Sequence, residues 1–163
     1  MSRLGYNLLH AANLLVVVSG CVYAWMLYLL EPIDEFALWN HPWQGLMREA
    51  HVVTAPLLVL AVGAAWAAHA LPRLRGPRKD GRATGLTMAL CFLPMALSGS
   101  LLQTSVSPGW ESTWRVMHLA ASALWTLAGL VHFAAALQSR KRTVSGASAA
   151  RRSSNTTGVR PGG

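Results

Sequence analysis

The sequence has little charge and very little cysteine. Only 12% of its 163 residues are Asp, Glu, Lys or Arg, and only two are cysteine. No Cys-x-x-Cys or Cys-x-x-Cys-His motif occurs, which excludes a dithiol redox centre and a covalently attached c-type haem. Because 53% of the residues are hydrophobic, the chain is either one very apolar domain or a membrane protein.

The hydrophobic residues are gathered into four long runs, which favours a membrane protein. Each run has about 20 residues or more, enough to cross the ~30 Å hydrocarbon core and too unbroken for a soluble amphipathic helix. The predicted spans are residues 8–30, 51–71, 84–104 and 116–137. They predict an all-α, integral membrane four-helix bundle over residues 1–137. Residues 138–163 are basic and have little to bury, so we expect a disordered tail.

The charges are divided unevenly between the two ends of the predicted spans. Arg48 and Arg115 lie on one side, together with all but one of the six acidic residues, and the other 12 of the 14 Lys and Arg residues lie on the opposite side. Lys and Arg are retained in the cytoplasm more often than they are translocated, so both termini are predicted to be cytoplasmic. The net charge of +8 is then a topology signal, and nucleic acid is not an expected partner.

The predicted outer loops are rich in tryptophan and acid. The first of them reads EPIDEFALWNHPWQGLMRE, with Trp39 and Trp43, and the second contains Trp110 and Trp114. Tryptophan is enriched where a membrane meets water, so these residues predict contact with lipid headgroups. The acidic side chains predict a docking face for a partner on that side.

Five of the six histidines lie within or at the edge of the predicted spans, where an ionisable side chain is costly and usually marks a site. His118 and His132, in MHLAASALWTLAGLVHF, are fourteen residues apart, which is about 21 Å along nearly the same helix face. His51 matches the depth of His118 at the outer level. His10 matches His132 at the inner level, where His69 is a rival.

Two pairs of imidazoles at two depths of an apolar bundle indicate two b-type haems, held without covalent attachment. Zinc would need three or four converging ligands, with cysteine or carboxylate among them. The predicted iron ligands are therefore histidines. They are His51 with His118 at the outer level, and His132 with His10, or with its rival His69, at the inner level.

Other residues near the predicted ligands fit this interpretation. Gly20 and Gly99 would let a flat macrocycle approach the helix backbone closely. Arg48 and Arg115 stand one turn outside the outer pair, where they are expected to bind haem propionates. The competing hypothesis is a non-haem scaffold or transport subunit whose histidines pack or relay protons, and a third is a haem sensor or haem-delivery protein.

Over residues 6–137 the chain resembles a known family. LLHAANLLVVVSG, the histidine that opens the second span and the two histidines of the fourth span resemble the di-haem cytochrome b subunits that anchor membrane formate dehydrogenases and nickel-iron hydrogenases. HPWQGLMREAHVVTAPLLVLAVGAAWAAH and LPMALSGSLLQ resemble a group of short bacterial membrane cytochromes b associated with multihaem cytochromes c. The resemblance implies His51 with His118 for the outer haem and His10 with His132 for the inner one.

The resemblance also implies a function. It implies the membrane subunit of a respiratory complex in the bacterial inner membrane, with no substrate chemistry of its own. Such a subunit passes electrons between the quinone pool and a periplasmic redox protein, such as a multihaem cytochrome c or an iron-sulfur subunit. His69 departs from the pattern of the dehydrogenase anchors and leaves the fourth ligand open. His69, Arg73, Asn7 and Asn13 are the candidates for a quinone site.

Overall fold

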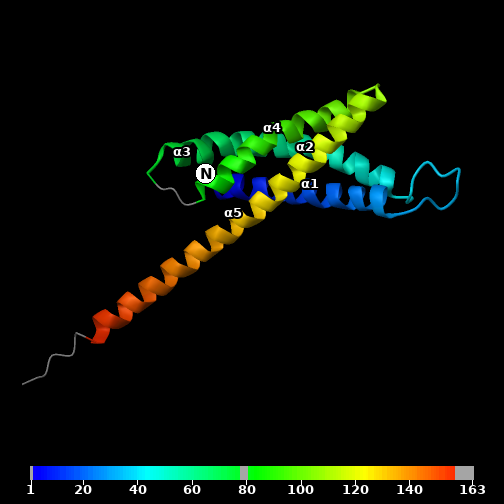
Figure 1. Cartoon of the computed structure of the whole chain (residues 1–163). Helices are drawn as coiled ribbons and strands as arrows, with labels where there is room; N and C mark the ends of the chain where they lie inside the picture. The colour runs from blue at the N-terminus through cyan, green and yellow to red at the C-terminus, as the bar shows by residue number, and fades with distance from the viewer. Residues whose placement is uncertain (1, 78–80, 157–163) are drawn as a thin grey trace, which may run out of the picture. The chain divides into compact units, whose positions relative to one another are not determined.

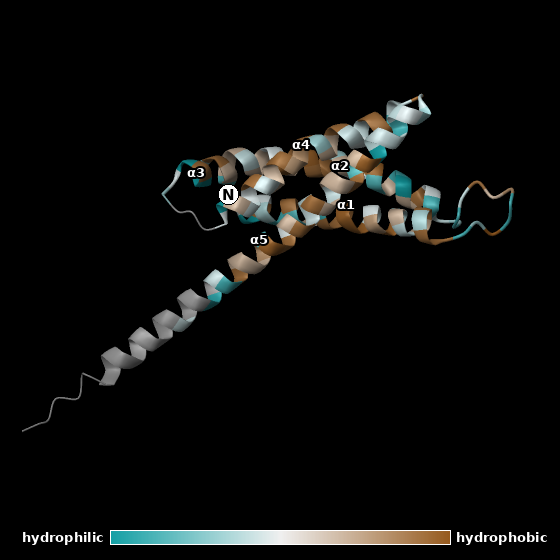
Figure 2. Cartoon of the chain, viewed as in Figure 1, coloured by the Kyte–Doolittle hydropathy of each residue, from teal (hydrophilic) through white to brown (hydrophobic). Residues whose placement is uncertain are grey.

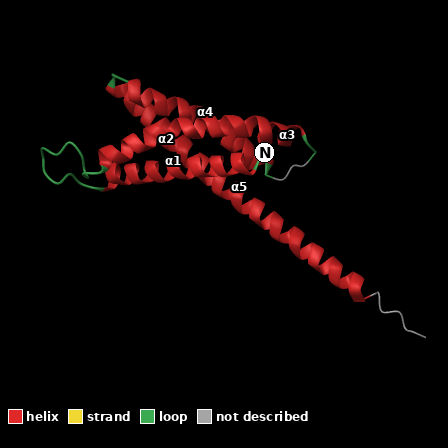
Figure 3. Ribbon diagram, turned by 180° about the vertical axis from the view of Figure 1, so that it is seen from behind, coloured by secondary structure: helices red, strands yellow, loops and turns green. Residues whose placement is uncertain are grey.

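All elements in the described part of the chain are helices. The computed structural model describes residues 2–77 and 81–156, and Figure 3 shows helices joined by loops over that part. The helices are α1 (Arg3–Leu29), α2 (Gln44–Ala65), the π-helical turn η1 (Trp66–Ala70), α3 (Leu71–Arg75), α4 (Arg82–Thr104) and α5 (Pro108–Thr156). The all-α prediction is confirmed.

Four helical stretches are long and apolar enough to cross a membrane. They are Arg3–Leu29, Gln44–Arg75, Arg82–Thr104 and Pro108–Ser139. In each, at most 17% of the most apolar stretch is buried within the protein, and Figure 2 shows hydrophobic residues interspersed with paler ones along the helices. Such apolar exteriors are typical of helices that cross a membrane. The prediction of a multi-pass membrane protein is confirmed at this level, and the helices extend a few residues beyond most of the predicted span ends.

The chain divides into two compact units, residues 1–78 and 79–163. In the first unit α1 packs against α2, and the loop between them is held at both ends by Asn40 (Figure 1). The amide of Asn40 donates to the carbonyls of Leu27 at 3.1 Å and Leu30 at 2.8 Å, and its backbone N–H donates to the buried side chain of Gln44 at 2.9 Å. Because the last carbonyls of a helix have no partner within it, these bonds stabilise the end of α1.

The second predicted span is not a uniform α-helix. After Pro56 the chain continues as α2 to Ala65, then changes to the π-helical turn η1 over Trp66–Ala70 and returns to α-helical geometry in α3. A single π-turn inserts an extra residue and rotates the side chains that follow it, and such turns are frequent at functional sites. His69 lies on this turn.

The second unit is the pair α4 and α5, joined by residues 105–107. Met95 of α4 and Ala121 and Trp125 of α5 are buried, and the rings of Phe92 and Trp125 are 5.4 Å apart. Ser98 is fully buried on α4, and its hydroxyl lies near the carbonyls of Pro94 and Met95 and the Nδ1 of His118. A hydroxyl in that position needs hydrogen-bond partners.

The fourth long helix continues beyond the apolar span. Residues 138–156 were expected to be disordered, but α5 remains helical through Thr156. These residues contain no proline, and Ala, Arg and Lys, which are good helix formers, extend a helix that is already nucleated. The last part of the predicted tail, residues 157–163, lies outside the described residues.

Candidate functional site

His51 of α2 is hydrogen-bonded to the backbone of α1. Its Nδ1 lies 3.0 Å from the carbonyl oxygen of Val16 and 3.3 Å from the hydroxyl of Ser19. A Cβ on Gly20 would lie only 2.8 Å from Cε1 of the imidazole, closer than real Cβ atoms approach other atoms. Glycine is therefore required for His51 to reach the α1 backbone.

His118 of α5 has the same surroundings in the other unit. Its Nδ1 lies 2.9 Å from the carbonyl oxygen of Met95 and 3.5 Å from the hydroxyl of Ser98. A Cβ on Gly99 would lie 3.0 Å from Cε1 of the ring. The two units thus present one histidine each against the same three groups of a neighbouring helix.

These three groups recur at fixed spacing along the helix. A carbonyl is followed after three residues by a hydroxyl side chain and after four by glycine, and positions i, i+3 and i+4 share one helix face. The N–H of residue i+4 already bonds to the carbonyl of residue i in an α-helix. When residue i+4 is glycine, the second lone pair of that carbonyl stays accessible to a side chain from outside. We call this arrangement the hydroxyl-glycine cradle.

A third cradle holds His132. Its Nδ1 lies 2.9 Å from the hydroxyl of Thr84, and that hydroxyl lies 3.1 Å from the carbonyl oxygen of Gly81. A Cβ on Gly81 would lie 3.2 Å, and one on Gly85 4.0 Å, from Cε1 of His132. The spacing of Gly81, Thr84 and Gly85 matches that of the other two cradles.

The two cradles of the second unit are in register. Thr84 and Ser98 are fourteen residues apart on α4, and His132 and His118 are fourteen residues apart on α5. Since the helices run antiparallel, the pair Thr84–His132 repeats the pair Ser98–His118 at a second level, about 21 Å along the helices. The histidine spacing seen in the sequence therefore has a matching spacing in the helix that faces it.

His10 and His69 have different surroundings. Both are exposed, and the His10 ring packs edge-on against Tyr6 with 4.1 Å between ring centroids. His69 lines an open pocket of about 430 Å³. The other residues that line it are Ser2, Arg3, Tyr6 and Asn7.

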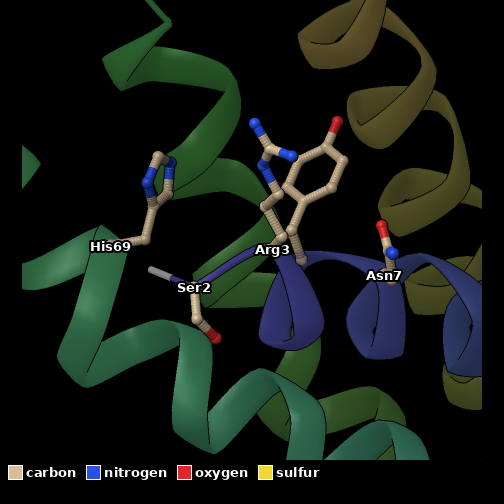
Figure 4. Close-up of a pocket in the computed structure, with 5 residues that line it drawn as sticks. Ser2, Arg3, Asn7 and His69 are labelled. Atoms are coloured by element: carbon tan, nitrogen blue, oxygen red, sulfur yellow. The ribbon is translucent and has the colours of Figure 1, made fainter.

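The pocket joins the start of α1 to the π-helical turn. In Figure 4 the side chains of His69, Arg3 and Asn7 extend in the same direction, and the hydroxyl of Ser2 points the other way. That hydroxyl accepts a hydrogen bond from the backbone N–H of Gly5 at 3.1 Å and caps the helix. Two of the four residues proposed for a quinone, His69 and Asn7, meet here, whereas Asn13 and Arg73 do not line this pocket.

The two arginines expected near haem propionates contact side chains of their own units. The guanidinium of Arg48 lies 5.5 Å from the centroid of a Trp39 ring. Arg115 forms an ion pair with Glu111, one turn earlier on α5, and both side chains are nearly half exposed. His41 accepts a hydrogen bond at Nδ1 from the backbone N–H of Trp43 at 3.1 Å and helps to shape the loop.

Sequence reasoning missed the third cradle. Gly20 and Gly99 are predicted from the sequence to let a macrocycle approach the backbone, and in the structure both glycines make room for an imidazole. Thr84–Gly85 lies fourteen residues before Ser98–Gly99, and no role is predicted for it from the sequence. The signal that identifies it is the equal spacing of the hydroxyl-glycine pairs and of the histidines.

Comparison with known proteins finds no match to a protein-family model, a curated protein or a solved structure. Among residues 2–77 and 81–156, no three His, Cys, Asp or Glu side chains converge as ligands of a bare metal ion. The candidate site is therefore defined by its own geometry, which is a set of single imidazoles, each fixed through Nδ1 to a neighbouring helix.

Proposed function

We propose that the protein is a membrane cytochrome b that carries two haems and transfers electrons across the bilayer. The observation that supports this most directly is the shared surroundings of His51, His118 and His132. Each of the three has its Nδ1 at a hydroxyl and its ring beside a glycine at the same spacing, and His51 and His118 also have Nδ1 at a backbone carbonyl. A repeated arrangement indicates that the three histidines have the same role. Iron ligation through Nε2 suits an imidazole whose Nδ1 is fixed by a hydrogen bond.

The donor set fits a b-type haem. A b-type haem would be held by single imidazoles on separate helices, which is the kind of donor that the chain provides. We assign His51 and His118 to the outer haem. His132 ligates the inner haem together with His10, and His69 is the rival for that last position.

The haem, when bound, supplies the one-electron chemistry, and the protein sets ligation, burial and access. The apolar side chains of the four helices would provide hydrocarbon around such a group and exclude water. We propose that the two units associate as a four-helix bundle in a bacterial inner membrane, with both termini in the cytoplasm. The acidic, tryptophan-rich loops then face the periplasm, where a multihaem cytochrome c or an iron-sulfur subunit would dock.

The pocket at His69 is our candidate for the quinone end of the path. Its polar lining of Arg3, Asn7 and His69 lies at the end of two apolar helices, where the headgroup of a membrane-dissolved quinone would lie. An imidazole and an amide there can donate or accept hydrogen bonds at quinone oxygens. His69 is thereby a candidate for proton transfer to the quinone.

Haem content of ligand variants tests the proposal. Pyridine haemochrome quantitation of the detergent-purified protein should give two b haems per chain, and His118→Ala should retain one. His41→Ala is the matched control, because its histidine lies in the loop outside the spans, and it should retain both. A wild-type protein purified without haem under haem-replete expression would exclude this function and favour a scaffold or proton-relay subunit.

A further inference from the structure

We propose that Thr84, Ser19 and Ser98 are positioning residues, which hold His132, His51 and His118 as the tautomer that ligates iron through Nε2. This inference rests on the proposed function and specifies how the protein controls its haems. It assigns a role to three hydroxyl side chains that do not themselves contact the iron.

The carbonyl groups decide the tautomer at His51 and His118. A carbonyl oxygen can only accept a hydrogen bond, and Nδ1 lies 3.0 Å from that of Val16 in one case and 2.9 Å from that of Met95 in the other. Nδ1 must therefore carry the proton. In a neutral imidazole the lone pair is then on Nε2, which makes Nε2 the ligating nitrogen.

The hydroxyl groups favour the same tautomer, because each of them donates its own proton to a backbone carbonyl. Ser19 donates to the carbonyl of Leu15 at 2.7 Å, and Ser98 donates to that of Pro94 at 2.6 Å. Thr84 donates to the carbonyl of Gly81 at 3.1 Å. Each oxygen is left to accept from Nδ1–H of its histidine, so a hydroxyl that is able to donate works here as an acceptor.

His41 provides a contrast within the same chain. Its Nδ1 receives the backbone N–H of Trp43, so in neutral His41 the proton is on Nε2. The loop histidine thus has the opposite tautomer from the three histidines in cradles. The shared tautomer of the three is set by their surroundings and does not follow from the residue type.

The expected consequence is control of haem affinity and reduction potential. A hydrogen bond accepted from Nδ1–H makes the imidazole a stronger donor to iron, and loss of such a partner typically weakens metal binding about 10-fold or more. A stronger donor stabilises ferric iron and lowers the reduction potential. Thr84 should have the largest effect, since its hydroxyl, at 2.9 Å, is the closest of the three to the imidazole it holds.

The experiment compares hydroxyl deletions with matched deletions on the same helix. Thr84→Ala is compared with Thr87→Ala, whose hydroxyl bonds to the Ala83 carbonyl, and Ser98→Ala with Ser100→Ala, whose hydroxyl bonds to the Ala96 carbonyl. Haem stoichiometry after extended dialysis and the midpoint potential of each haem are measured in the full-length protein. Thr84→Ser, which keeps the hydroxyl, is the rescue variant.

The expected result is a higher midpoint potential and at least about 10-fold faster loss of the inner haem in Thr84→Ala. Thr84→Ser, Thr87→Ala and Ser100→Ala should match the wild type, and Ser98→Ala should change the outer haem by a smaller amount. Equal potentials and retention in Thr84→Ala and Thr87→Ala, with two haems in the wild type, would overturn the inference and leave the proposed function intact. A wild type without haem would overturn both.

Discussion

The two units of the chain carry their histidines differently. In the unit of α4 and α5, two cradles repeat in register and hold His118 and His132. In the unit of α1 and α2, one cradle holds His51, and the positions fourteen residues before Ser19 and fourteen residues after His51 are Gly5 and Ala65, with neither a hydroxyl nor an imidazole. One unit thus provides a fixed imidazole at each of two levels, and the other provides only one.

The two units differ at the end of the first unit that contains the start of α1 and the π-helical turn η1, opposite the loop that joins α1 and α2. There the chain has a π-helical turn, an open polar pocket and two exposed histidines, His10 and His69. The proposed fourth ligand, His10 or His69, is therefore held in another way from His51, His118 and His132. We expect this end to combine ligation with access for a second molecule, and the following predictions test that contrast.

The largest expected effect is the loss of one whole haem. His10→Ala should retain only the outer haem, because the inner iron would lose an axial ligand, whereas His69→Ala should retain both. Pyridine haemochrome quantitation with low-temperature difference spectra measures the number of haems and identifies the one that is lost. The reverse pattern, with a haem lost only in His69→Ala, would make His69 the ligand.

The next effect is on electron entry with both haems present. If His69 serves the quinone, His69→Ala should abolish haem reduction by a quinol, and Asn7→Ala should slow it, because both side chains line the pocket. The rate is measured by stopped-flow absorbance in nanodiscs. Asn13→Ala, a change in the same helix outside the pocket lining, is the control, and an unchanged rate in His69→Ala would remove the pocket from the path.

A graded effect is expected from alanine at the cradle glycines. A Cβ would meet Cε1 of the histidine at 2.8 Å in Gly20→Ala, 3.0 Å in Gly99→Ala and 4.0 Å in Gly85→Ala, and would meet nothing within 4 Å in Gly63→Ala. Haem retention should fall in the first two variants, because the imidazole must move away from its carbonyl. The last two should retain haem like the wild type. Equal retention in all four would contradict the close packing of the cradles.

The smallest effect separates stability from haem binding. Asn40→Ala removes two hydrogen bonds to the last carbonyls of α1 and should lower the free energy of unfolding by about 1–2 kcal/mol. The hydrogen-bond partners of Asn40 are Leu27, Leu30 and Gln44, none of which belongs to a cradle, so the midpoint potentials should not change. Thermal unfolding in nanodiscs measures the first quantity and redox titration the second. A shifted potential would mean that the loop and the haem sites are coupled.

The helices were predictable because their cause is local. A run of about 20 apolar residues is sufficient to predict a span, and the fourteen-residue spacing of His118 and His132 follows from helix geometry alone. The polar parts of the chain were harder. The continuation of α5 to Thr156 depends on propensity outside the hydrophobic pattern, and the π-turn at His69 interrupts a stretch that looked uniform.

The cradles could be predicted only in part. Gly20 and Gly99 could be predicted as places of close approach to a helix backbone, but which carbonyl meets which imidazole depends on the rotation and register of two packed helices. Thr84 lies in the first turn of α4, where a threonine is common simply because it is near a helix end. Only the facing helix shows that it is a partner of His132.

A redox titration of the purified wild-type protein, followed by its visible spectrum, tests the central claim most directly. We predict two b-type components in equal amounts, both lost only when histidines of both levels are replaced. A colourless protein that does not respond to dithionite, or a single weakly held haem that exchanges with added haem, would contradict the account.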